Sequence, residues 1–211
     1  MKKYKLYLFD FDGTLFDTSK ALNMVFKISF AKVGVQVRDD QITWLSRVPL
    51  PEACRVLNCP DDEASKKLFI DTINASVDSQ ESINLTELFE ESLAFFDYVK
   101  KNNVHIGIVT SNNANHVKDI LNHFNIPVSL FDVIVGNVEA PIPKPDPLPI
   151  NVALKMASYD GELSDVVYIG DSHNDCLSAI NANIDTYLLD QLGNSSEPYK
   201  KIKNLMNLFD L

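Results

Sequence analysis

Cysteine is scarce in this chain of 211 residues, and the three that occur are Cys54, Cys59 and Cys176. An odd number of cysteines does not make a closed disulfide framework, and no Cys/His spacing matches a zinc site. We therefore expect buried or idle thiols in a reducing compartment. Glycine and proline, with 7 and 10 residues, are not enriched, so no segment is predicted to be a low-complexity linker.

Long hydrophobic runs are also missing, because no segment approaches the ~20 apolar residues of a membrane span. The apolar stretch at residues 5–11 is too short for a signal peptide and contains Asp10. Positive charge is in the minority, with 19 Lys and Arg against 29 Asp and Glu, a net charge of −10. No basic stripe for nucleic acid is visible. We expect a cytoplasmic protein, a monomer or homodimer, with neither nucleic acid nor membrane as partner.

Five short apolar runs, rich in β-branched or aromatic residues, predict strands that are buried on both faces. These runs lie at residues 5–9, 104–109, 133–135, 166–169 and 186–189, and helical patterns lie at 85–101, 113–124, 148–158 and 175–182. Strand and helix alternate along this part of the chain. The alternation predicts an α/β fold, a Rossmann-like doubly wound parallel sheet with right-handed crossovers.

The interval between the first two predicted strands interrupts this alternation. It carries helical patterns at residues 17–33, 51–57 and 61–77. We predict a core domain at residues 1–15 and 86–211, and an inserted helical cap domain at residues 16–85. The alternative is that these helices pack directly on the sheet, but an insertion just after the first acidic motif favours a cap.

Acidic residues follow two of the predicted strands. Asp10 and Asp12 end the first strand, and Asp171 and Asp175 follow the strand at 166–169. Ligands of open α/β sheets bind beyond the carboxyl ends of the strands, and an isolated carboxylate is costly to bury. The acids therefore indicate a site for a hard cation such as Mg²⁺ or for a phosphoryl group. For Asp171 and Asp175 the alternative is a helix cap and a favourable first-turn acid.

Two further motifs offer groups that suit phosphate. Thr110, Ser111 and Asn112 follow the second predicted strand, where hydroxyl and amide groups near a helix start can bind phosphate oxygens. Lys144 lies among four prolines, which restrict its backbone and would direct its cation. The alternatives are a helix cap for the first and a stiff surface loop for the second. All four motifs follow strands, and packing alone does not explain that convergence.

The stretch Asp10-Phe11-Asp12-Gly13-Thr14-Leu15, together with Gly170-Asp171-Ser172 and Asp175, resembles the haloacid dehalogenase superfamily. All four motifs occur in the order expected for that superfamily and cover the whole core. The resemblance implies a helical cap and a small phosphorylated metabolite as substrate. A site of this kind is compatible with an acidic protein, because a site can be locally positive.

The resemblance also implies roles for the motif residues. Asp10 is the nucleophile that becomes an aspartyl phosphate, and Asp12 is the general acid and then the general base. Thr110, with Ser111 and Asn112, binds the phosphoryl group, and Lys144 neutralises charge.

The same resemblance implies Mg²⁺ held by Asp10, the backbone carbonyl of Asp12 and Asp171. Asp175 would support the metal through water or orient Lys144. A dianionic phosphate repels a carboxylate nucleophile, and a metal ion with a lysine removes that repulsion.

Asp12 narrows the reaction class, since dehalogenases of this superfamily lack an acid at that position. The remaining branches are phosphatases of the phosphoglycolate phosphatase type and mutases of the β-phosphoglucomutase type. The mutases place a histidine where this chain has Leu22, and a glutamate where it has Gly170. Both departures favour a Mg²⁺-dependent phosphatase of small phosphate monoesters. The alternatives are a phosphomutase and a non-catalytic binding module on the same fold.

Two more residues are candidates for contact with the substrate. Arg47 lies in a segment that resembles the one in which the mutases bind a distal phosphate, and arginine suits bidentate binding of phosphate or carboxylate. The alternative for Arg47 is a solvent-facing or capping role. His173 lies inside the fourth motif and is expected at the mouth of the site.

Overall fold

The computed structural model describes residues 3–45, 48 and 50–209. The chain forms two compact units: Met1–Asp17 with Leu88–Leu211, called unit 1 here, and Thr18–Glu87, called unit 2. Unit 2 is thus inserted into unit 1 after the first strand and its turn. The sequence placed the corresponding boundaries at residues 15/16 and 85/86.

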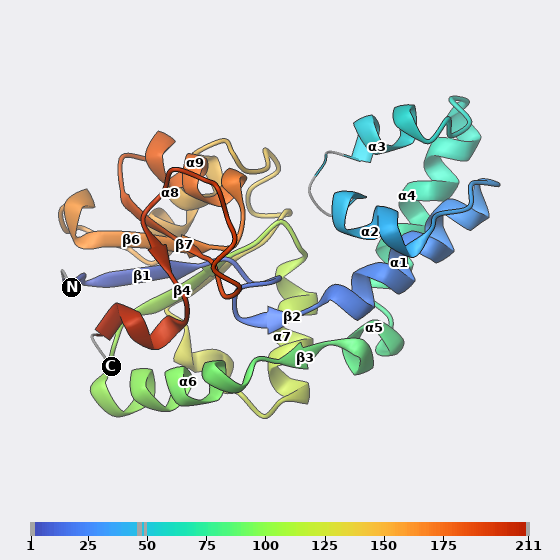
Figure 1. Ribbon diagram of the computed structural model, residues 1–211. Helices are drawn as coiled ribbons and strands as arrows, with labels where there is room; N and C mark the ends of the chain where they lie inside the picture. The colour runs from blue at the N-terminus through green and yellow to red at the C-terminus, as the bar shows by residue number, and fades with distance from the viewer. Residues whose placement is uncertain (1–2, 46–47, 49, 210–211) are drawn as a thin grey trace. The chain divides into compact units, whose positions relative to one another are not determined.

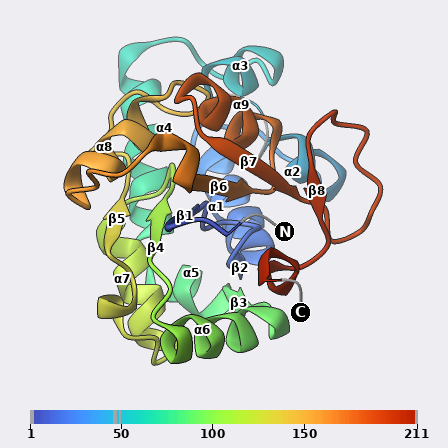
Figure 2. The same cartoon turned by 90° about the vertical axis from the view of Figure 1, so that its left-hand side faces the viewer.

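Unit 1 contains a six-stranded parallel sheet with the order β5-β4-β1-β6-β7-β8 (Figures 1 and 2). Its strands are β1 (Leu6–Phe9), β4 (Ile106–Val109), β5 (Val133–Val135), β6 (Val166–Gly170), β7 (Asp185–Leu189) and β8 (Lys201–Ile202). In the register of the central strands, Phe9 lies opposite both Ile108 and Ile169. The residues that follow β1, β4 and β6 therefore emerge at the same edge of the sheet.

Helices cover both faces of this sheet (Figures 1 and 2). One face carries α6 (Glu90–Asn102) and α7 (Ala114–His123), and the other carries α8 (Leu148–Met156) and α9 (His173–Asn181). Short 3₁₀ segments lie at Val128–Leu130, Leu163–Asp165 and Leu205–Phe209. The predicted fold class, a doubly wound parallel α/β sheet, is confirmed.

The strands of unit 1 are buried because both of their faces are covered. Between the sheet and α8 and α9 lies one apolar cluster, formed by Leu6, Leu8, Val109, Val133, Val135, Ala140, Ile150, Ala153, Leu154, Val166, Tyr168, Ala179, Ala182 and Ile184. Continuous apolar strands such as Leu6–Phe9 are what burial on both faces requires. The sheet is a rigid base for the loops at its carboxyl edge.

Unit 2 is helical, as the sequence predicted for this interval. It contains α1 (Ser19–Lys32), α2 (Asp39–Leu45), α3 (Leu50–Val56), α4 (Glu63–Val77) and α5 (Gln80–Leu85). Its own core is formed by Phe26, Phe30, Ile42, Leu45, Ala53 and Phe69. The rings of Phe30 on α1 and Phe69 on α4 lie 4.8 Å apart at their centroids, which joins the two longest helices of the unit.

Several short elements differ from the sequence expectation. The two-residue strands β2 (Phe16–Asp17) and β3 (Glu87–Leu88) pair with each other where the chain enters and leaves unit 2. Helix α6 begins at Glu90 and not at residue 85, because α5 and β3 occupy the residues before it. Helix α9 begins two residues earlier than predicted, because Ser172 caps it. Among the described residues, none of the helices combines the length and the hydropathy of a membrane span.

Candidate active site at the carboxyl edge of the sheet

The four sequence motifs meet beyond the carboxyl ends of the central strands of unit 1. Asp10 follows β1, Thr110 follows β4 and Asp171 follows β6, and the register brings these strand ends side by side. Lys144 reaches the same place from the loop before α8. Residues that are more than a hundred positions apart in the sequence thus form one cluster.

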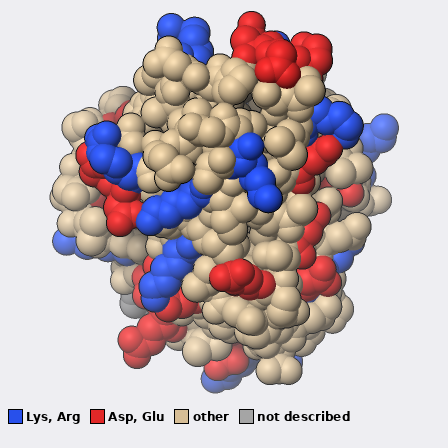
Figure 3. Space-filling view, turned by 90° about the vertical axis from the view of Figure 1, so that its right-hand side faces the viewer, with Lys and Arg blue, Asp and Glu red and all other residues tan. Residues whose placement is uncertain are grey.

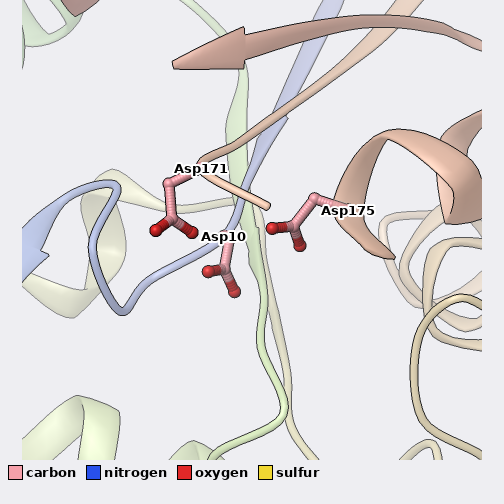
Figure 4. A group of neighbouring side chains, drawn as sticks. All are labelled: Asp10, Asp171 and Asp175. Carbon is pink, nitrogen blue, oxygen red and sulfur yellow. The ribbon is translucent and has the colours of Figure 1, made fainter. Parts of the chain in front are cut away.

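Three carboxylates of this cluster point toward one another (Figure 4). Asp10, Asp171 and Asp175 each offer an oxygen, and these oxygens lie within 4.8 Å of one another. Gly13 lies directly against this cluster with a positive φ of 76°, and a Cβ atom there would stand 2.6 Å from an Asp171 carboxylate oxygen. The glycine therefore meets two demands, the left-handed turn and the close approach of Asp171.

Two of these carboxyl groups, Asp10 and Asp171, have raised pKa values. Burial raises the pKa of Asp10 well above its ordinary range, and Asp175, Asp12 and Asp171 add to the rise while Lys144 opposes it. Solvent reaches Asp171, yet desolvation and the charge of Asp175 raise its pKa to about 6. Crowded carboxylates of this kind fit a hard divalent cation, which relieves their repulsion and accepts oxygen ligands. Asp10 and Asp171 are the residues that would hold it.

Lys144 is the cation that the protein itself supplies. Its side chain is only 8% exposed, and its Nζ donates to Asp10 Oδ1 at 2.7 Å and to Asp175 Oδ1 at 2.6 Å. Burial alone would lower the pKa of Lys144, but the attraction of Asp10 and Asp175 outweighs burial and raises the pKa well above its ordinary value. The lysine is therefore charged and held directly beside the proposed nucleophile.

Tyr168 completes the surroundings of Lys144 and was not assigned a role from the sequence. Its side chain is fully buried in β6. The hydroxyl donates to the carbonyl of Val109 at 2.7 Å and accepts from Lys144 Nζ at 3.1 Å. A buried tyrosine hydroxyl requires hydrogen-bond partners. Because the strand at 166–169 was expected to be buried on both faces, the tyrosine within it was the one sign in the sequence that such partners exist.

The motif after β4 forms a hydrogen-bonded turn. The Thr110 hydroxyl accepts from the amide of Asn112 at 3.0 Å and lies 3.4 Å from Asp12 Oδ2, to which it donates. Asn112 accepts from the amide of Asn113 at 2.8 Å, and Ser111 is exposed. The N-cap of α7 is Asn113, whose side chain accepts from Asn115. Thr110 and Asp12 are therefore brought together, while Asn113, the residue after Asn112, caps helix α7.

Asp175 serves the helix and the lysine at once. Ser172 and Asp175 form a capping box at the start of α9, in which the amide of Ser172 donates to Asp175 Oδ2 at 3.0 Å. The other oxygen of Asp175 accepts from Lys144. The capping alternative weighed for this motif therefore describes Asp175 correctly, with Ser172 as the N-cap in place of Asp171. Contact with a metal through water stays a prediction.

Of the two residues predicted to contact the substrate, the structure describes His173 but not Arg47. The Nδ1 atom of His173 lies 3.1 Å from a carboxylate oxygen of Glu197 and 2.9 Å from the hydroxyl of Tyr199. The His173 side chain is 53% exposed, so its contact with substrate stays a prediction. Arg47 lies outside the described residues.

A separate hollow of about 420 Å³ lies within unit 2, among α1, α4 and α5. Its walls include Met24, Ile28, Thr72 and Ala75. None of the four motifs contributes to it, so it offers no chemistry comparable to that of the carboxylate cluster.

Comparison with known proteins identifies the family. The model of the haloacid dehalogenase-like hydrolase family matches residues 7–189. A phosphoglycolate phosphatase of Pasteurella multocida is 27% identical over 188 residues, which cover 85% of this chain and 82% of that protein. The pyrophosphatase PpaX of Oceanobacillus iheyensis is 25% identical over 179 residues, which cover 85% of this chain and 80% of that protein.

A solved structure agrees with these sequence relatives. A Bacteroides fragilis protein described as a haloacid dehalogenase-like hydrolase superposes with a TM-score of 0.85 at 27% identity, covering 98% of this chain and 100% of that chain. The resemblance inferred from the four motifs is confirmed, and so is the expected enzyme class, a phosphatase of this superfamily. The chain therefore belongs to the haloacid dehalogenase-like hydrolases.

Proposed function

We propose that this chain is a Mg²⁺-dependent phosphatase that hydrolyses a small-molecule phosphate monoester through an aspartyl phosphate on Asp10. The observation that carries the proposal is the cluster at the carboxyl edge of the sheet, where Asp10, Asp171 and Asp175 lie together and a buried lysine contacts Asp10 and Asp175. In the proposal this cluster supplies the nucleophile, the acidic metal ligands and a fixed positive charge.

The first half-reaction joins Asp10 to the phosphoryl group. A carboxylate oxygen of Asp10 attacks phosphorus, and the bond from phosphorus to the ester oxygen breaks. Bound at Asp10 and Asp171, Mg²⁺ supplies charge neutralisation that favours the ionised carboxylate and the transferring oxygens. Lys144, 2.7 Å from Asp10, lowers the charge that the incoming phosphate meets.

Asp12 moves the proton in both halves of the reaction. In the first half it gives a proton to the departing alcohol oxygen, and in the second half it takes a proton from the water that attacks the aspartyl phosphate. The 3.4 Å hydrogen bond from Thr110 Oγ1 orients the Asp12 carboxylate. In this proposal Thr110, with Ser111 and Asn112, contacts the transferring phosphoryl group.

The substrate is proposed to be a small, anionic phosphorylated metabolite. The sequence relatives are named for phosphoglycolate and for pyrophosphate, two compact anions. Unit 2 is proposed to act as a cap domain that selects the substrate, with Arg47 and His173 as candidate contacts.

The cysteines of the described part are free thiols, which is consistent with the cytoplasmic location that we propose.

A phosphomutase is the second candidate, and the packing around Gly170 disfavours it. A Cβ atom at Gly170 would stand 2.4 Å from both Cβ and Cγ of Asp175 and 2.6 Å from its Oδ2. The glutamate that the mutases carry there would displace Asp175 from Lys144. A non-catalytic binding module is the third candidate, and the complete set of motif residues disfavours it.

The test is a turnover assay with an aryl phosphate and a panel of phosphorylated metabolites, with and without Mg²⁺. We expect release of inorganic phosphate that depends on Mg²⁺, and no release by Asp10→Asn. Production of an isomeric sugar phosphate without phosphate release would favour the mutase. An inactive protein that binds the metabolites equally well with and without Asp10→Asn would favour the binding module.

A further inference from the structure

The two cysteines of unit 2 are brought together by the way helix α3 ends. The amide of Cys59 donates to the carbonyl of Cys54 at 2.9 Å, and the amide of Asn58 donates to the carbonyl of Arg55 at 3.4 Å. Asn58 adopts a left-handed conformation with φ of 53°. These features define a Schellman motif, in which the residues at positions C3 and C″ commonly contact each other through their side chains.

In this helix the two contacting positions are both cysteine. Cys54 occupies C3 and Cys59 occupies C″, and the backbone hydrogen bond from Cys59 to Cys54 holds the two residues side by side. Both side chains are partly exposed and pack against the core of unit 2. Cys176, by contrast, is buried in unit 1 and stands 0% exposed. The pair is therefore accessible to small reagents, whereas the third cysteine is protected.

We propose that Cys54 and Cys59 form a thiol modification site that a small-molecule disulfide oxidises to an internal disulfide. A disulfide requires Cα atoms within roughly 4.4–6.8 Å, and the backbone hydrogen bond between these residues keeps their backbones adjacent. The motif is local to α3 and the loop that follows it. The bond would close between two residues whose backbones are already joined by a hydrogen bond.

The proposal assigns different steps to the two thiols. Burial, followed by the neighbouring Cys54 thiol, raises the pKa of Cys59, so Cys59 keeps its proton. In the proposal Cys54 is the thiol that first attacks one sulfur of the oxidant. Once Cys54 is tied in a neutral mixed disulfide, its contribution to the raised pKa of Cys59 disappears.

The exchange with glutathione disulfide balances in two steps. The Cys54 thiolate bonds to one sulfur and expels a glutathione thiolate. The Cys59 thiolate then attacks the Cys54 sulfur and expels the second glutathione thiolate. The two protein thiols lose two electrons and two protons, and glutathione disulfide becomes two glutathione thiols.

The experiment treats the full-length protein with glutathione disulfide in the presence of Mg²⁺ and counts free thiols after denaturation. We expect the count to fall from three to one, with a monomer mass lower by two hydrogen atoms and full reversal by dithiothreitol. Peptide mapping should join the segments that hold Cys54 and Cys59. This result requires no variant, so it does not depend on whether a substituted protein folds.

Variants test whether the second thiol resolves the adduct, and whether the oxidation is specific to this pair. Cys59→Ser should stop at a stable glutathione adduct on Cys54, and the matched control Cys176→Ser should still lose both of its remaining thiols. Three free thiols after prolonged treatment would overturn the proposal. A persistent adduct on the wild type, or a bond between two chains, would also overturn it, because either result shows that the two thiols do not close on each other.

Discussion

At the scale of single residues, the division of labour between Asp10 and Asp12 leads to the sharpest prediction. Asp10→Asn removes the nucleophile, so no phosphoenzyme should appear in acid-quenched samples analysed by mass spectrometry. Asp12→Asn should slow turnover by about 10²–10⁴-fold, the range for loss of a general acid or base. Because Asp12 is expected to bind the metal through its backbone carbonyl, the affinity for Mg²⁺ should change little.

The matched control for these two variants is Asp160→Asn, an exposed carboxylate in the same unit. It removes one negative charge without touching the carboxylate cluster, so turnover should stay at the level of the wild type. A phosphoenzyme formed by Asp10→Asn would mean that another residue accepts the phosphoryl group.

Tyr168 supports a second prediction at this scale. Tyr168→Phe removes the hydroxyl that links Lys144 to the Val109 carbonyl while keeping the buried ring. Loss of a buried hydrogen bond costs about 1–1.5 kcal/mol, so a loosely held lysine should lower kcat roughly tenfold. We expect KM to change less than kcat, because the lysine acts on charge that develops during transfer.

The comparison variant is Tyr4→Phe, which loses a different tyrosine hydrogen bond, the 2.9 Å contact with Asp185. It should lower thermal stability to a similar degree and leave kcat unchanged. Equal effects of both tyrosine variants on kcat would show that Tyr168 acts through general stability and not through Lys144.

At the scale of elements, the start of α9 joins helix stability to the site. Ser172→Ala breaks the capping box, which should cost about 1 kcal/mol of unfolding free energy. It also removes the hydroxyl that donates to Asp175 Oδ2 and leaves only the backbone amide of residue 172 as a donor to that oxygen, so the Asp175 contact with Lys144 should loosen and kcat should fall. Denaturant melts and steady-state kinetics measure the two effects.

Asp62→Ala is the matched control for that prediction. Asp62 caps α4 through the amide of Ser65 at 2.9 Å and is exposed. It should show a comparable loss of stability without a change in kcat. If Ser172→Ala lowers stability and leaves kcat untouched, then Asp175 does not depend on the capping box for its position.

The same scale shows why parts of the fold could be predicted and others could not. Strands such as Leu6–Phe9 and Val166–Gly170 are continuous apolar runs because both faces are buried, and that pattern is visible in the sequence. The strands β2 and β3 have two residues each and carry no period, so they were missed. Their formation depends on pairing between residues about seventy positions apart, which local propensity does not encode.

The candidate site also has residues that the sequence predicted and residues that it did not. Asp10 and Asp171 were predicted because acidic groups at the ends of apolar strands conflict with packing, and Lys144 was predicted because the surrounding prolines restrict its backbone. The role of Tyr168 was not, since a tyrosine in a strand is ordinary and its hydroxyl partners come from β4 and the loop before α8. The adjacency of Cys54 and Cys59 also escaped the sequence, because it depends on the left-handed conformation of Asn58.

At the scale of the whole molecule, surface charge bears on the choice of partner. On the face in Figure 3, Lys and Arg occur singly or in small groups among acidic and uncharged side chains. Together with the net charge of −10, this distribution favours a small substrate over nucleic acid. That preference stays a prediction, and a filter-binding measurement with duplex DNA at physiological salt, with no retention expected, would check it.

The stability of the whole molecule should depend jointly on pH and Mg²⁺. The pKa of Asp171 rises from 3.8 to about 6 on folding, so over this window the native state binds more protons than the unfolded state. The free energy of unfolding of the metal-free protein should therefore decrease as pH rises through about 6. Mg²⁺ binds the ionised carboxylates, so its stabilising effect should grow over the same range.

Thermal melts at about pH 5 and about pH 7.5, with and without Mg²⁺, measure this coupling. At a Mg²⁺ concentration 100 times the dissociation constant, binding adds about 2.7 kcal/mol, which corresponds to an increase in Tm of roughly 5–10 °C for a protein of this size. Asp171→Asn should abolish most of that increase and flatten the pH dependence, because it removes both the titrating group and a metal ligand. An equal increase in Tm at the two pH values, or one retained by Asp171→Asn, would place the stabilising Mg²⁺ away from the carboxylate cluster.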